Sequence, residues 1–178
     1  DERVVLPGAP GSVDGVGENA TVEGNQGSMR YRVQVEVPQG FAGLTPDIDL
    51  VYSSGSGAGP LGIGWSMPSF SIERMTSKGL QKYDLTDRFV VDGSDELVKV
   101  SETGTEAVYR ARFEGGFVKW TWRSRGTGEE GYWTAEYPDG RVGTFGADAQ
   151  GQAVTTAQVR VPSTSKVWRW QLTQVVDP

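Results

Sequence analysis

Apolar and polar side chains alternate along many short stretches of this chain, and this period of two limits the fold more than any other feature. In residues 29–37, Met29, Tyr31 and Val33 point to one side while Arg30 and Arg32 point to the other. Successive side chains of a β-strand face opposite ways, so each stretch of this kind predicts a half-buried strand. The same pattern recurs over residues 48–52, 109–113, 118–122, 133–137 and 168–172.

Turn-forming residues separate these stretches. Asp92-Gly93-Ser94 lies between the apolar runs 89–91 and 97–100, Gly115-Gly116 follows the stretch 109–113, and Pro138-Asp139-Gly140 follows 133–137. Such residues are typical of β-hairpins. No segment has an apolar stripe at helical spacing, and the many glycines would weaken a helix. We therefore predict an all-β fold of antiparallel hairpins, arranged as a sandwich-like or irregular β-stack.

The tryptophans are expected to form the core. Trp120 and Trp122 share one face with Val118, and the same spacing places Trp168 and Trp170 on one face with Leu172. Charged residues occupy the opposite faces. Regular alternation of this kind favours burial of the rings over their exposure to solvent, and Trp133 fits the same interpretation. A carbohydrate-binding surface built from exposed rings stays an alternative.

The chain is expected to have two regions. Residues 1–28 are rich in glycine and lack periodicity, which predicts an extended arm, and residues 29–178 are expected to form one all-β domain. No signal peptide is visible at Asp1, and the last residues directly follow a strand-like run. We therefore expect a fragment of a longer chain, with strand edges that a partner or a second copy could cover.

Residues 53–64 are rich in glycine, but the pattern does not fit a phosphate-binding loop. Neither a helix nor a nearby lysine follows, since Trp65 begins a strand-like stretch and the next lysine is Lys78. A tight crossing of the backbone explains the glycines better. If a ligand site exists, we expect it at this loop and its rim, formed by Tyr52, Trp65 and Phe70.

Composition excludes several kinds of chemistry. The 178 residues contain no Cys and no His, which rules out thiol nucleophiles, Ser-His-Asp triads and HExxH zinc sites. The net charge of −6 makes nucleic-acid binding improbable, and no apolar run is long enough to span a bilayer. A glycosidase using two carboxylates, or a Ca²⁺ site at Asp84, Asp87, Asp92 and Asp95, stays open as an alternative. The candidate acids are Asp47, Asp49, Asp84, Asp87, Asp92, Asp95, Glu96, Glu129 and Glu130.

A series of ordered motifs resembles the N-terminal region of the SpvB/TcB family of bacterial toxin proteins. The motifs are Leu6-Pro7-Gly8, Gly15-Val16-Gly17-Glu18, Gly43-Leu44-Thr45-Pro46, the stretches 50–55, 59–66 and 72–80, and YDLTDRF (83–89) with DGSDELV (92–98). The match is close over residues 5–100 and looser over 101–178.

This resemblance implies a secreted, toxin-associated protein. In the family, the region begins a β-rich shell of Rhs or YD-repeat hairpins around a toxic C-terminal segment, and the ADP-ribosyltransferase of SpvB lies in a separate domain. The expectation is thus a non-enzymatic scaffold with no catalytic residue, metal site or cofactor. Its partners would be the downstream shell of the same chain and other toxin-complex subunits.

Overall fold

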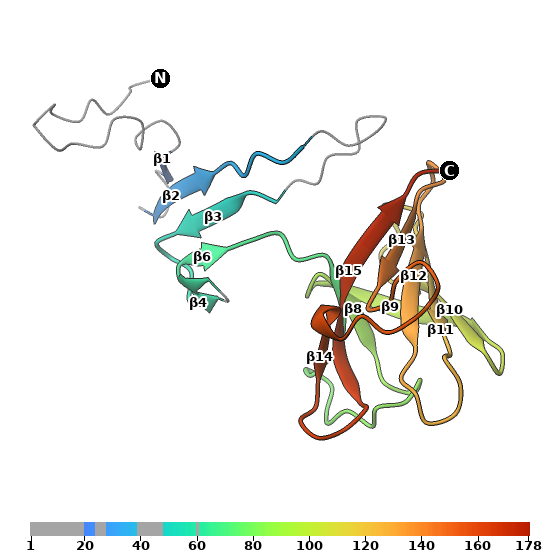
Figure 1. Ribbon diagram of the computed structural model, residues 1–178. Coiled ribbons are helices and arrows are strands. Elements are labelled where there is room, and N and C mark those ends of the chain that lie inside the picture. Colours follow the sequence, from blue (N-terminus) through green and yellow to red (C-terminus); the bar gives the residue numbers. More distant parts are fainter. Residues whose placement is uncertain (1–19, 24–27, 39–47, 60) are drawn as a thin grey trace, which may run out of the picture. The chain divides into compact units, whose positions relative to one another are not determined.

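The computed structural model describes residues 20–23, 28–38, 48–59 and 61–178. Contacts divide the chain into two compact units, Asp1–Pro68 and Ser69–Pro178, here called the first and second units. Apart from the 3-10 helix Thr155–Ala157, the regular elements of the described residues are all strands (Figure 1), so the all-β prediction is confirmed.

The first unit is a four-stranded antiparallel sheet in the order β1-β2-β3-β6. Between β3 and β6, the glycine-rich segment forms the small hairpin β4–β5. The strands are β1 (Ala20–Glu23), β2 (Ser28–Val33), β3 (Leu50–Ser53), β4 (Ala58–Gly59), β5 (Gly62–Ile63) and β6 (Trp65–Ser66).

The strand predicted over residues 29–37 is shorter in the structure. Regular pairing ends at Val33, although alternate side chains stay half-buried as far as Val37. Just beyond Val33, the carboxylate of Asp49 accepts a hydrogen bond from the backbone N–H of Val35 at 3.2 Å. The Val35 N–H is thus bonded to the Asp49 side chain and is not available to pair with a neighbouring strand. The predicted arm 1–28 contributes β1, and its boundary at residue 28 stays a prediction.

The second unit is an antiparallel barrel. Its sheet runs in the order β13-β12-β11-β10-β9-β8-β7-β15-β14, and a further pairing of β13 with β15 closes it. The strands are β7 (Ser71–Arg74), β8 (Phe89–Val91), β9 (Asp95–Glu102), β10 (Glu106–Ala111), β11 (Lys119–Arg123), β12 (Tyr132–Glu136), β13 (Val142–Phe145), β14 (Gln158–Arg160) and β15 (Val167–Val176).

Closure depends on the length of β15 and on irregular pairing. β14 pairs with residues 167–170 of β15, and β13 pairs with residues 172–176 (Figure 1). Register shifts occur in the β9–β10, β13–β15 and β14–β15 pairings. Such bulges increase twist and bend strands, which lets an antiparallel sheet close into a barrel, a detail that the predicted sandwich-like or irregular β-stack did not specify. Closure also removes the free edges of the barrel strands.

The predicted turns form as expected. Asp92 and Gly93 both have positive φ (49° and 74°) between β8 and β9, and Gly140 has φ of 89° between β12 and β13. These left-handed conformations suit Asp and Gly, which is why these residues favour tight hairpins.

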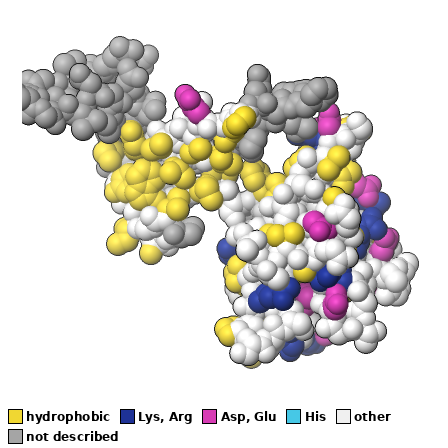
Figure 2. Space-filling model, viewed as in Figure 1, with side chains coloured by type: hydrophobic (Ala, Val, Ile, Leu, Met, Phe, Trp, Pro, Cys, Tyr) yellow, Lys and Arg dark blue, Asp and Glu magenta, His cyan; other side chains and the backbone are white. Residues whose placement is uncertain are grey.

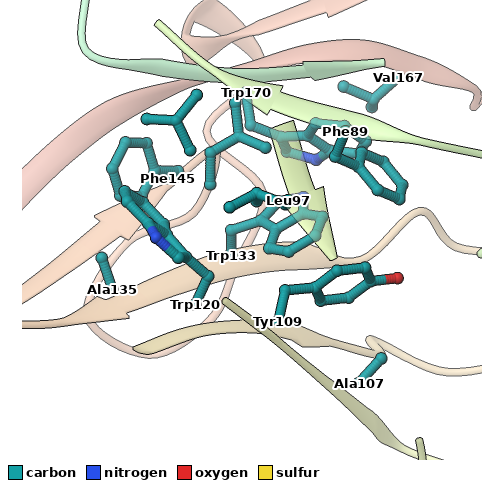
Figure 3. Close-up of a cluster of buried hydrophobic side chains, with 12 residues drawn as sticks. Phe89, Leu97, Ala107, Tyr109, Trp120, Trp133, Ala135, Phe145, Val167 and Trp170 are labelled. Carbon is teal, nitrogen blue, oxygen red and sulfur yellow. The ribbon is translucent and has the colours of Figure 1, made fainter. Parts of the chain in front are cut away.

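Aromatic side chains fill the barrel (Figure 3). Trp133 and Trp170 are fully buried, and the ring of Phe89 lies 4.8 Å from that of Trp133. The core cluster consists of Ile72, Phe89, Val91, Leu97, Ala107, Tyr109, Trp120, Trp133, Ala135, Phe145, Val167 and Trp170. The interior of a small eight-stranded barrel is narrow enough for side chains to fill it, so these rings form the hydrophobic core of the barrel.

One tryptophan departs from the predicted core. Trp122 is half-buried and packs against the cluster, as expected from its face, but Trp168 does not belong to it. The register shift between β14 and β15 inserts an extra residue at this point, and the Trp168 ring instead stacks under the Arg169 guanidinium at 4.6 Å. Simple alternation could not reveal this bulge.

Candidate functional site

The rim residues Tyr52 and Trp65 lie on adjacent strands of the first unit. They are cross-strand partners, with ring centroids 5.4 Å apart and planes tilted by 58°. Tyr31, opposite Tyr52 on β2, packs edge-on against Trp65 at 6.4 Å and 86°. Sequence reasoning did not include Tyr31, although the alternation in residues 29–37 placed it on the apolar face. The three rings form one contiguous cluster.

The glycine loop is shaped by close backbone contacts. A Cβ added at Gly64 would lie 2.5 Å from the Tyr52 ring, and one at Gly59 would lie 2.4 Å from the Trp65 carbonyl oxygen. The N–H of Ser53 donates to Gly64 and the N–H of Gly64 donates to Gly57, at 2.8 and 2.9 Å. The loop therefore folds back on Tyr52 and uses these donors internally, as expected for a tight crossing.

Phe70 belongs to the second unit, just before β7, and 45% of its surface is exposed. Tyr52 and Trp65 belong to the first unit. Phe70 as a rim residue, and ligand binding at this loop, stay predictions.

The tyrosine–tryptophan cluster is part of a wider apolar face. By register, Tyr31, Val33, Leu50, Tyr52 and Trp65 share one side of the sheet, and each is only half-buried. Figure 2 shows apolar side chains gathered on this unit. All buried apolar residues of the described chain lie in the second unit. A sheet that is apolar on one face usually buries that face against another layer. The opposite side carries Arg30, Arg32, Val51, Ser53 and Ser66.

Most candidate acids of the described residues are engaged in structural contacts. The best-buried group surrounds Arg74, whose guanidinium donates to the carboxylates of Asp87 and Glu130 at 2.9 and 2.7 Å. Its side chain is 1% exposed and also donates to the carbonyl oxygens of Asp84 and Val167, both at 2.9 Å. Burial raises the pKa of the Glu130 carboxyl, although Arg74 opposes the shift.

The remaining acids are scattered along the chain, and among them Asp49 is buried. Asp49 pairs with Arg32, and Glu129 with Arg125. Glu96 lies between two arginines, and Asp92 accepts the backbone N–H of Ser71 at 2.7 Å. Asp47 lies outside the described residues. Among the described residues, no three acidic side chains are grouped so that they could hold a metal ion. No helix in the described part of the chain is both long and apolar enough to cross a bilayer.

Comparison with known proteins gives a consistent answer. The family model described as "Salmonella virulence plasmid 65kDa B protein" matches residues 23–178. The mono(ADP-ribosyl)transferase SpvB of Salmonella typhimurium is 39% identical over 77 residues, which are 43% of this chain and 12% of that protein. The SpvB of Salmonella choleraesuis matches equally well. The chain thus spans a small part of these relatives.

Solved structures show the same relationship. The TcdB2-TccC3 crystal structure superposes with a TM-score of 0.72 and 28% identity, covering 99% of this chain and 9% of that one. The N-terminal domain of the effector SpvB from Salmonella typhimurium strain LT2 gives 0.67 and 26%, covering 82% and 51%. The matches to SpvB therefore lie in its N-terminal region, and the catalytic domain is not among them. With most of its length matched by the family model, this chain belongs to the SpvB family, as a counterpart of the N-terminal region of SpvB and Tc-toxin proteins.

Proposed function

We propose that this chain is a non-catalytic structural and interaction module at the N-terminal end of a secreted toxin-complex protein. There it contributes to a β-rich encapsulating shell, or docks a partner subunit. The partners are the downstream Rhs or YD-repeat hairpins of the same protein and other toxin-complex subunits. The resemblance to TcdB2-TccC3 and to a Tc holotoxin pore supports this context.

The observation that carries the proposal is the apolar face of the first unit. Five large apolar side chains stand on one side of a four-stranded sheet, and none of them is fully buried. Burying such a face contributes roughly 25 cal/mol for each Å² removed from water, so a covering layer would stabilise the sheet substantially. This is the behaviour expected of a piece of a larger β-assembly.

Packing explains the rings of this face better than sugar binding does. Sugar stacking needs rings that lie open and flat, whereas Tyr31 and Tyr52 meet Trp65 at interplanar angles of 86° and 58°. Tilted and edge-to-face geometry is what aromatic rings adopt when they pack against each other. A carboxylate hydrolase is also less well supported, because Asp87 and Glu130, two acids with little exposed surface, share one arginine as their ion-pair partner.

Hydroxyl-radical footprinting tests the proposal. We expect Trp65 to be oxidised rapidly in the isolated 178-residue chain and several-fold more slowly in the assembled toxin protein that carries it. Trp133, which is fully buried in the barrel, is the internal control and should be protected in both. Equal oxidation of Trp65 in the two samples would show that no layer covers the face and would refute the proposal.

A further inference from the structure

The loop between β10 and β11 carries two exposed aromatic rings. Phe113 and Phe117 flank the turn at Gly115-Gly116, with 88% and 71% of their surfaces exposed. The alternation of residues 109–113 predicted Phe113 to be on the core face, but it lies beyond the end of β10 at Ala111. Two neighbouring rings this exposed contribute little to the barrel core.

The backbone at Phe117 makes the loop more unusual. Its φ is 50°, a left-handed conformation that a bulky residue adopts only at a cost. Tyr83 and Asp92 share this conformation, but Tyr83 lies under the Arg74 guanidinium and Asp92 accepts the Ser71 N–H. Phe117 has no recorded ring contact within the described residues. A glycine would fit this backbone without strain, so the phenyl ring here points to a role outside the barrel.

Cationic side chains stand behind the rings. The Arg110 guanidinium donates to the Phe117 carbonyl oxygen at 3.3 Å, and no ion pair is recorded for it within the described residues. Arg88 and Arg112 share a single acid, Glu96, at 3.1 and 2.8 Å. The outer surface of β8–β10 and the adjoining loop therefore has three guanidinium groups against two carboxylates, those of Glu96 and of the exposed Glu114 in the loop, although the whole chain carries a net charge of −6.

We propose that this loop, residues 112–118 with Arg110 and Arg88 behind it, is a peripheral attachment site for an anionic phospholipid bilayer. The phenyl rings enter the boundary between headgroups and acyl chains, and the guanidinium groups meet the phosphates. Apolar rings at the turn and cations behind them follow the order of layers that a bilayer presents. Exposed rings on both sides of a glycine pair, at the turn of the β10–β11 hairpin, suit a deformable apolar phase better than a shaped protein groove.

Vesicle co-sedimentation tests this site. The protein should bind vesicles of equimolar phosphatidylcholine and phosphatidylserine, bind pure phosphatidylcholine weakly, and lose binding as salt rises. The double variant Phe113→Ser/Phe117→Gly should lower the partition coefficient about tenfold or more, since each ring loses its apolar contact. Arg110→Glu should also weaken binding, mainly to the anionic vesicles.

Two controls distinguish binding at this loop from nonspecific hydrophobic binding and from misfolding of the variants. Leu80, 96% exposed and outside the loop, provides a matched variant, and Leu80→Ser should bind as the unchanged protein does. Phe117→Gly alone should melt no lower than the unchanged protein because it relieves the left-handed strain. Absent or equal binding to the two kinds of vesicle would overturn the proposal, as would an equal loss in Leu80→Ser. Loss of binding to a protein partner alone would instead identify the loop as a protein-docking element.

Discussion

Replacing Arg74 by methionine should destabilise the barrel more than removal of any surface ion pair. Arg74 is buried beneath Tyr83, Phe89 and Trp170, with its guanidinium 5.1–5.3 Å from each ring centroid. Through its hydrogen bonds it joins β7 to the loop before β8, the loop before β12 and the start of β15. Methionine conserves much of the apolar volume, so the change isolates the charge.

The magnitude follows from what the substitution leaves behind. Asp87 and Glu130 are 8% and 13% exposed and would lose their shared cation. Breaking a buried ion pair from one side typically costs about 3–5 kcal/mol, because the other charge stays buried. Since native proteins are stable by only about 5–15 kcal/mol, this is a large fraction of the total. Urea unfolding followed by tryptophan fluorescence would measure it, because most tryptophans lie in the barrel.

Two further variants make the reasoning refutable. Arg141→Met removes an exposed pair with Asp139 and should lower the free energy of unfolding far less than Arg74→Met does. Adding Asp87→Asn and Glu130→Gln to Arg74→Met removes the stranded charges and should recover part of the lost stability. An Arg74→Met protein within about 1 kcal/mol of the unchanged protein, or a triple variant no more stable than the single one, would contradict the account based on buried charge.

Three other changes have defined outcomes. Burial raises the pKa of Asp92 above its unfolded value, so its contribution to stability is lost as pH rises through the native pKa. Asp92→Asn should therefore gain stability over the unchanged protein above about pH 4, by less than about 1 kcal/mol in urea titrations, because the side chain is partly solvated; an unchanged pH profile would refute this. Gly146→Ala should cost about 2–4 kcal/mol, because φ is +73° and the new Cβ would lie 2.5 Å from the Trp170 ring; a melting temperature equal to that of the unchanged protein would argue against it. Trp170→Phe should cost about 2–3 kcal/mol in urea unfolding by losing the 2.9 Å hydrogen bond to the Gly131 carbonyl oxygen and opening a cavity, and a neutral effect would contradict this.

Parts of the candidate site could be read from the chain, and parts could not. The glycine loop marked Tyr52 and Trp65 as neighbours of a tight crossing, and the structure shows that close approach. Tyr31 joins them only through the pairing of β2 with β3, a long-range register that local patterns do not encode. The Arg74 cluster was missed for the same reason, because its hydrogen bonds reach residues up to 93 positions away. Sequence reasoning named Asp84, Asp87 and Glu130 as candidate acids and did not place them with Arg74 in one buried cluster.

Local stereochemistry determined the all-β class, the hairpin turns and most of the aromatic core. Alternation of apolar and polar residues shows directly which side chains share a face of a strand, and Asp-Gly and Pro-Asp-Gly sequences mark left-handed backbone positions in turns. Both features can therefore be predicted without knowing which strands pair. Only the tertiary structure decided that the hairpins close into a barrel, that the bulge turns Trp168 out of the core, and that the chain divides after Pro68. These features depend on which distant strands pair and in what register, and that choice is set by the summed packing of the whole sheet rather than by any one segment.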